Sequence, residues 1–398
     1  WGSSYTTINN ANLILRHVPD IAFSDENQKN LILANAHFVR AYTYYNIVRV
    51  WGDAPVILTP TESTGREIYP SRSPRAEVYA QVAQDIESAL THITSNAQGC
   101  YYATVDNINM LKADFALWMY AAQRGGDSYL TMAGEALDAV TRTPLLGKFA
   151  DVFDVKNKAN KEIAFALHVD ATNEVHSASY IQRFIWGSTQ VKASYRNVEG
   201  GVPVSSNQWF CYADEFIGEL KRNKEQNNDQ RSDVTYMERT GVSDMYEKVG
   251  WPNKFTGDWS SGTLLYDDDL ILYRYAQYYM FRAELYYYRK QYKEALGELN
   301  VVAQRAYGKA DFYTSATQQD VLEALAAENR WEFAEEGNLW FTYIRLGYID
   351  TYCPLKYWPN TGVEGGVGGS TNPNIYLFPI STSAINKNSN LRQTEGWS

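Results

Sequence analysis

The sequence predicts a mostly α-helical protein, in which tetratricopeptide-like helix pairs form a curved scaffold with a long loop-rich insertion and few short strands. Apolar residues recur at spacings of three and four near both ends of the chain, as in amphipathic helices. Two helix pairs each span roughly 34 residues and carry small residues where the helices would cross. Between Leu146 and Asp269 this periodicity is lost, and Gly, Ser, Asn, Tyr and Trp accumulate.

Length and composition indicate a folded chain with a large core. The chain has 398 residues, of which 45% are hydrophobic and 21% charged, so it is neither disordered nor fibrous. We interpret residues 1–398 as one domain. Its helical scaffold would comprise residues 1–145 and 269–348, and residues 146–268 and 349–398 would form loop-rich regions that face a ligand.

Charge and cysteine content exclude several classes of protein. The formal net charge of -10 opposes binding to a polyanion, so we expect no nucleic-acid partner. Three cysteines without CxxC spacing are too few for a disulfide framework. The sequence contains no apolar run of about 18 residues and no leader at its start. Residue 1 is therefore either a mature start or a start within a longer protein.

The first helical block runs from about Tyr5 to Arg142. Its clearest helix ends at Trp51-Gly52 and is followed by Pro55; its apolar stripe consists of Leu31, Ala34, Phe38, Ala41, Tyr45 and Val48. Three more helices are predicted over 76–91, 107–122 and 128–142, the last two joined by a turn at 124–127. The small residues Ala113, Ala116 and Ala133 would let this last pair approach closely.

The second helical block repeats this arrangement. A tyrosine-rich helix is predicted over 270–290, with the stripe Leu272, Ala276, Tyr279, Ala283 and Tyr286. Its partner covers 291–308, where Gly308 is placed to end the helix. A further helical block runs from 320 to 346. In the insertion, the short apolar segment 162–169 predicts a buried strand, and helical periodicity returns briefly over 211–225.

Four segments, in order, resemble motifs of the SusD/RagB family of outer-membrane nutrient-binding lipoproteins. The first two are AHFVRAYTYYNIVRVWGDAPVIL (36–58) and LILYRYAQYYMFRAELYYY (270–288). The others are ENRWEFAEEGNLWFTYIRLG (328–347) and the terminal LFPISTSAINKNSNLRQTEGW (377–397). Their order along the chain makes the resemblance specific.

This resemblance implies a binding protein without catalytic residues, and we expect no cofactor and assign no metal ligands. Such a protein would bind an oligosaccharide, or alternatively a peptide, on the extracellular face of the outer membrane. It would act as a lid over a SusC-like TonB-dependent transporter and close by a hinge. The family's lipid-bearing cysteine and the long segment that follows it are absent from this chain, so the membrane anchor would lie outside it.

Aromatic rings beside amides in the loops are the candidate ligand contacts, because sugars stack their C–H faces on rings and need polar groups at the ring edge. The run SSNQWFCYADEF places Trp209 and Tyr212 beside Asn207 and Gln208, and the resemblance favours these two rings. Further candidates are Trp186, Tyr195, Arg196, Asn197, Tyr357 and Trp358. Each ring has a structural alternative, which is packing its own loop onto the scaffold.

Acidic residues offer a competing hypothesis of glycoside hydrolysis. One predicted helix carries Glu328, Glu332, Glu335 and Glu336, and two carboxyls one turn apart could act as acid and base. We favour an ion-paired helix with Arg330 and Arg345 nearby. The run 267–269 is all Asp, which we interpret as a solvated helix start with Asp269 as N-cap rather than a cation site.

Two other hypotheses remain from the sequence. A tetratricopeptide scaffold could bind a partner peptide on its helices instead of its loops. The histidines show no metal-binding spacing, and we expect packed or surface roles for all five: His17, His37, His92, His168 and His176. The glycine-rich run at 365–369 lacks the strand-to-helix context of a phosphate-binding loop and is predicted to be flexible.

Overall fold

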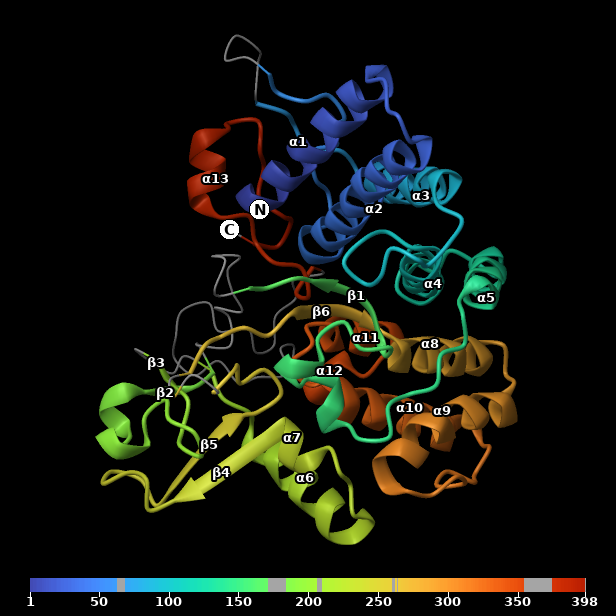
Figure 1. Cartoon of the computed structure of the whole chain (residues 1–398). Coiled ribbons are helices and arrows are strands. Elements are labelled where there is room, and N and C mark those ends of the chain that lie inside the picture. Colours follow the sequence, from blue (N-terminus) through green and yellow to red (C-terminus); the bar gives the residue numbers. More distant parts are fainter. Residues whose placement is uncertain are drawn as a thin grey trace. The chain divides into compact units, whose positions relative to one another are not determined.

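The computed structural model describes residues 1–62, 69–170, 184–205, 210–259, 262, 264–353 and 374–397. The chain forms two compact units (Figure 1). Unit 1 consists of Trp1–Val140 and Tyr343–Ser398, and unit 2 consists of Thr141–Thr342. The single domain predicted for residues 1–398 stays a prediction.

Unit 1 is built from packed helices. They are α1 (Gly2–His17), α2 (Glu26–Trp51), α3 (Arg75–His92), α4 (Val105–Ala121), α5 (Ser128–Ala139), α12 (Ile349–Tyr352) and α13 (Thr382–Lys387). Helix α2 packs on α1 and α3, and α4 packs on α5 (Figure 1). The mostly helical fold and its helix pairs therefore follow the predicted pattern.

Buried ion pairs connect the helices of unit 1. The Arg40 guanidinium of α2 donates two hydrogen bonds to Asp85 of α3, at 2.6 and 2.8 Å. Asp114 of α4 lies between Arg49, whose guanidinium is 3.4 Å away, and Arg345, whose guanidinium is 2.7 Å away. Arg345 therefore pairs with Asp114.

Unit 2 combines helices with three small sheets. Its helices are α6 (Asp214–Asn227), α7 (Ser232–Thr235), α8 (Tyr275–Tyr288), α9 (Tyr292–Tyr307) and α10 (Gln318–Phe333), and the chain passes into unit 1 within α11 (Leu339–Leu346). The strands are β1 (Ile163–Leu167), β2 (Trp186–Gly187), β3 (Val204–Ser205), β4 (Tyr236–Thr240), β5 (Lys248–Pro252) and β6 (Leu270–Arg274). β1 pairs antiparallel with β6, β4 antiparallel with β5, and β2 parallel with β3.

The predicted helix over 270–290 is correct only from Tyr275 onward. Residues Leu270–Arg274 form β6 instead, paired with the predicted strand β1. Ile271 and Tyr273 are buried at alternate positions, as a strand requires. The backbone N–H of Arg274 then donates to Gln277 Oε1 at 2.9 Å, which caps the start of α8. Gly308 ends α9 in the left-handed conformation, as predicted.

A buried group of charged side chains lies at the centre of unit 2, and we call it the central ion cluster. Its members are Glu162, Asp229, Arg231, Lys254, Arg274, Arg305, Glu328, Glu332 and Glu336. Glu332 contacts Arg231, Arg274 and Arg305 at once. Burial alone would raise the pKa of Glu332, but these three guanidinium groups hold it well below its usual range.

Neutralising the centre of this cluster tests its contribution to stability. Glu332→Gln leaves three buried cations short of one negative charge, so we expect the free energy of unfolding to fall by about 3–5 kcal/mol. Denaturant unfolding followed by circular dichroism measures this loss. The matched control is Asp233→Asn, which removes the exposed pair with Lys224 and costs under about 1 kcal/mol. Equal losses in both variants would contradict a stabilising role for the cluster.

Candidate functional site

The ring-bearing insertion of unit 2 has a small core of its own. Seven apolar side chains from the β2–β3 and β4–β5 segments form it: Ile185, Val191, Val202, Val204, Val242, Val249 and Trp251. Trp186, Met237 and Tyr266 pack against this core from its edge. Residues that sequence analysis treated as one long irregular stretch therefore have a packed base that can hold exposed rings in place.

Trp186 lies on this base and has an aromatic neighbour. Its indole N–H donates to the carbonyl of Gly250 in β5 at 2.6 Å. Its ring centroid is 4.8 Å from that of Tyr246, with 60° between the planes. The Tyr246 side chain remains 39% exposed. One predicted ring is thus fixed by a hydrogen bond beside a second ring that solvent reaches.

Polar side chains lie on the same segments of the chain as this ring pair. The side-chain amide of Gln190 lies 3.4 Å from the Tyr246 hydroxyl. The ammonium of Lys192 is 3.2 Å from the carboxylate of Asp244, which is 84% exposed. We call Trp186, Gln190, Lys192, Asp244 and Tyr246 the ring site. It combines flat apolar faces with an amide and charged groups, as a site for hydroxylated ligands requires.

The neighbouring loop uses two predicted site residues to hold its own shape. Asn197 adopts φ +48°, and its amide both accepts from the Val204 N–H and donates to the Val204 carbonyl. Arg196 Nε donates to the carbonyl of Val191 at 2.6 Å. Only the Tyr195 ring of this group is exposed, at 38%. A ligand role for Tyr195, Arg196 and Asn197 stays a prediction.

Tyr212 packs inside unit 2. Its ring lies 5.0 Å from that of Phe216 and 6.1 Å from that of Tyr236. Tyr212 therefore packs its own segment onto the scaffold, which is the alternative to ligand binding given above for each predicted ring. The other predicted contacts, Asn207, Gln208, Trp209, Tyr357 and Trp358, lie outside the described residues.

Sequence reasoning missed Gln190, Lys192, Asp244 and Tyr246. Sixty positions separate Trp186 from Tyr246 in the sequence. Tyr246 lies in the turn between the paired strands β4 and β5, and Gly250 of β5 accepts a hydrogen bond from the Trp186 indole. The two rings therefore meet only in the folded chain. The sequence signal for such a site was Tyr246 itself, a tyrosine in the Gly- and Ser-containing run before β5. A tyrosine in a loop does not show which other ring it will contact in the folded chain.

The carboxylates of α10 are not arranged for glycoside hydrolysis. Glu328 and Glu332 are fully buried and each contacts a guanidinium of the central ion cluster. A hydrolytic pair must flank an open cleft, which neither carboxylate does. The ion-paired helix is therefore correct, and the nearby Arg330 pairs with Glu219 of α6 at 2.9 Å.

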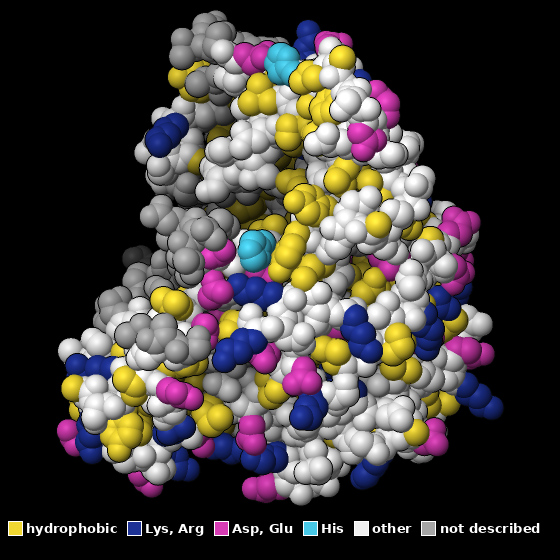
Figure 2. Space-filling view, viewed as in Figure 1, with side chains coloured by type: hydrophobic (Ala, Val, Ile, Leu, Met, Phe, Trp, Pro, Cys, Tyr) yellow, Lys and Arg dark blue, Asp and Glu magenta, His cyan; other side chains and the backbone are white. Residues whose placement is uncertain are grey.

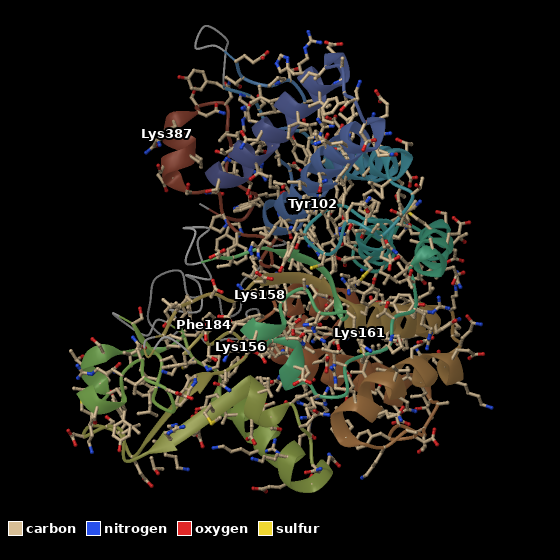
Figure 3. All side chains as sticks on the ribbon, in the orientation of Figure 1. Tyr102, Lys156, Lys158, Lys161, Phe184 and Lys387 are labelled. Carbon is tan, nitrogen blue, oxygen red and sulfur yellow. The ribbon has the colours of Figure 1, made fainter. Side chains whose placement is uncertain are left out.

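The acidic run at 267–269 also differs from its prediction. Asp269 precedes the strand β6 rather than a helix, and its carboxylate accepts from the backbone N–H of Val169. Asp268 is only 3% exposed, and Asp267 pairs with Lys158 at 2.6 Å. Figure 3 shows Lys158 with Lys156 and Lys161 on the segment before β1. The run is thus a paired, partly buried cluster and not a solvated helix start.

The described residues contain neither a metal-binding cluster nor a membrane-spanning helix. No group of three or more His, Cys, Asp or Glu side chains there could hold a metal ion. No helix in that part of the chain is long and apolar enough to cross a membrane. Figure 2 shows basic and acidic side chains intermingled over the visible face of unit 2.

A hollow between α6 and β4 is less suited to stacking. It measures about 690 Å³ and contains one ring, that of Tyr236. Two ion pairs line it: Lys221 with Glu238 at 2.7 Å and Lys224 with Asp233 at 2.6 Å. The ring site, by contrast, has two neighbouring rings.

Known proteins resemble this chain over its whole length. Residues 182–397, more than half of the chain, match the model described as the SusD family, and residues 1–105 match one described as starch-binding and associating with the outer membrane. SusD-like protein P25 of Formosa agariphila is 25% identical over 408 residues, covering 92% of this chain and 73% of that protein.

Solved structures share the fold. A SusD superfamily protein from Bacteroides fragilis superposes with a TM-score of 0.78 at 22% identity, covering 98% of this chain and 85% of that chain. Surface glycan-binding protein A of Bacteroides thetaiotaomicron, solved with laminarihexaose, has a TM-score of 0.74 at 16% identity, covering 100% and 85%. These similarities agree with the predicted tetratricopeptide-like helical fold.

The raised pKa of Asp268 predicts how the free energy of unfolding depends on pH. Burial raises its pKa from 3.8 to about 7, although the Gly257 N–H and Lys158 oppose the shift. The bound proton therefore stabilises the fold fully below pH 3.8, and this contribution is lost as pH rises to about 7. We expect the free energy of unfolding to fall by up to about 1.4 kcal/mol per pH unit from this group. Unfolding at pH 5 and pH 8 should show a smaller difference in Asp268→Asn, and an unchanged difference would contradict this assignment.

Proposed function

Because this chain belongs to the SusD family, we propose that it binds an oligosaccharide at the ring site without catalysing a reaction. The observation that carries the proposal is the Trp186–Tyr246 pair, with ring centroids 4.8 Å apart. The faces of such a pair stack against sugar C–H groups. Gln190, Lys192 and Asp244 then supply donors and acceptors for hydroxyls at the ring edge.

The fixed geometry of the ring site favours useful affinity. Trp186 is held by Gly250 and by the apolar core beneath it, so little side-chain freedom is lost when a sugar binds. A single exposed ring pair still makes few contacts. We therefore propose that further rings contribute along an oligomer, with Tyr195 and the predicted Trp209 as candidates, together with Asn207 and Gln208.

The similar proteins support a place at the cell surface. The matched family model is described as starch-binding and associating with the outer membrane, and the glycan-binding neighbour was solved with laminarihexaose. We propose that this protein likewise acts at the outer membrane, on its extracellular face. In that setting it would be held by a lipid anchor and deliver its ligand to a SusC-like TonB-dependent transporter.

Tyr246→Ala tests the ring site directly. We expect this variant to lose roughly three- to tenfold in affinity for glycans that the wild type retains, because one stacking face is removed. A glycan and peptide array, followed by calorimetry on each hit, measures the change. Tyr69→Ala is the matched control, since Tyr69 is a similarly exposed tyrosine, at 48%, in unit 1. Wild-type affinity in Tyr246→Ala would refute the ring site, and hits confined to peptides would favour a peptide ligand.

Incubation with the glycans that bind tests the absence of catalysis. We expect no new reducing ends over hours, because Glu328 and Glu332 are buried against guanidinium groups. Release of reducing ends that disappears in Glu335→Gln would instead support a hydrolase. A known glycosidase in parallel shows that each glycan can be cleaved under the same conditions.

A further inference from the structure

The loop that joins β4 to β5, residues 241–247, carries the exposed ring of the ring site, Tyr246. Loops on a protein surface are ordinarily more mobile than the strands they connect. Ser243 of this loop is nevertheless only 9% exposed, although Met245, two positions further on, is 66% exposed. A buried hydroxyl needs hydrogen-bond partners, so its contacts show which parts of the chain it connects.

The Ser243 hydroxyl makes three hydrogen bonds. It donates to the backbone carbonyl of Gln190 at 2.6 Å. Its oxygen accepts from the backbone N–H of Met245 at 3.1 Å and from that of Tyr246 at 3.2 Å. One donor and two acceptor lone pairs are the full capacity of a hydroxyl. A single oxygen atom therefore connects the backbone of Tyr246 to the segment that contains Gln190.

That segment is continuous with the strand of Trp186. Gln190 ends the short helix η5 (Ser188–Gln190), which directly follows β2. The side-chain amide of Gln190 also lies 3.4 Å from the Tyr246 hydroxyl. The backbone N–H of Lys192 adds a further link to the loop, since it donates to the carbonyl of Val242 at 2.9 Å. Both the backbone and the hydroxyl end of Tyr246 are thus connected to the segment that follows Trp186.

We propose that Ser243 is a positioning residue of the ring site, whose hydroxyl fixes the backbone of Tyr246 and so keeps its ring beside that of Trp186. The two ring centroids are 4.8 Å apart. A ring that is held in place before binding loses less freedom when a sugar stacks on it, so affinity rises without a new contact. The effect on affinity rests on the proposed function, whereas the effect on the loop does not.

Ser243→Ala removes the hydroxyl and with it the acceptor of two backbone N–H groups. We expect the amides of Met245 and Tyr246 to exchange faster with deuterium, because their hydrogen bonds protect them in the wild type. Exchange resolved to single amides, measured without ligand, detects this effect. The amide of Asn253 donates to the carbonyl of Thr235 at the other end of the hairpin, and it should keep its rate as the internal reference.

Ser232→Ala is the matched control variant. Ser232 is also buried in unit 2, and its hydroxyl donates to the carbonyl of Leu220 in α6 at 2.8 Å. This variant makes the same chemical change at α6, so it should leave the exchange of both loop amides unchanged.

Two further variants separate the hydroxyl from the size of the Ser243 side chain. Ser243→Thr keeps a hydroxyl and should retain most of the protection of the two amides. Ser243→Cys keeps a similar size but forms only weak hydrogen bonds, so its amides should exchange faster. Circular dichroism shows which variants are folded, and the cysteine variant carries the same comparison if the alanine variant does not fold.

A double-mutant cycle tests whether Ser243 acts on affinity through Tyr246. The probe is the oligosaccharide of the glycan array that the wild type binds most tightly. We expect Ser243→Ala to lose roughly two- to tenfold in affinity, and no more than Tyr246→Ala loses. In the Tyr246→Ala background the same change should have no effect, because the ring that Ser243 positions is gone. An equal loss in both backgrounds would overturn the proposal.

The two measurements distinguish this inference from the proposed function. Unchanged exchange of both amides in Ser243→Ala would overturn the inference. Faster exchange together with wild-type affinity in Tyr246→Ala, or with no glycan bound by the wild type, would support the connection of Ser243 to the loop and contradict the proposed function. An affinity that falls in Tyr246→Ala but not in Ser243→Ala would contradict this inference alone.

Discussion

Unit 2 depends on a single requirement, that the buried charges of the central ion cluster all find partners. Desolvating a carboxylate or a guanidinium costs several kcal/mol, which is recovered only when the opposite charge lies in contact. Arg274 satisfies Glu162, Glu332 and Glu336 together, and Arg231 satisfies Asp229 and Glu328. Loss of any one partner leaves a buried charge uncompensated, so the segments that carry them can be arranged in few ways.

The same cluster positions the ring site. Arg231 precedes β4 and Lys254 follows β5, and both side chains are fully buried in the cluster. The β4–β5 hairpin is therefore fixed at both of its ends. The Gly250 carbonyl in this hairpin accepts a hydrogen bond from the Trp186 indole N–H. This bond fixes Trp186 relative to the hairpin. A loop-rich region thereby obtains the rigidity that stacking contacts require.

Glu335 and Glu336 show how adjacent residues can serve different purposes. Glu336 pairs with Lys254 and Arg274, and it contributes to the scaffold. Glu335 forms no ion pair among the described residues; its carboxylate accepts from the Lys254 backbone N–H at 3.4 Å, and burial raises its pKa to about 8. Both residues lie in the turn after α10, where Glu335 adopts a left-handed φ of +69°.

The sequence alone determined the helices, because their apolar periodicity and stops such as Gly308 are local properties. It also determined the family, through four ordered motifs, and the strand over β1. It could not separate β6 from α8, because Leu272 continues the helical stripe while the pairing partner of that segment lies more than a hundred residues upstream. Among the predicted site residues, the described part of the structure brings Trp186 to an exposed neighbouring ring and packs Tyr212 inside. The partners of Glu332 and the meeting of Trp186 with Tyr246 were decided only by the tertiary structure, since long-range contacts depend on how distant segments pack and not on the residues beside them.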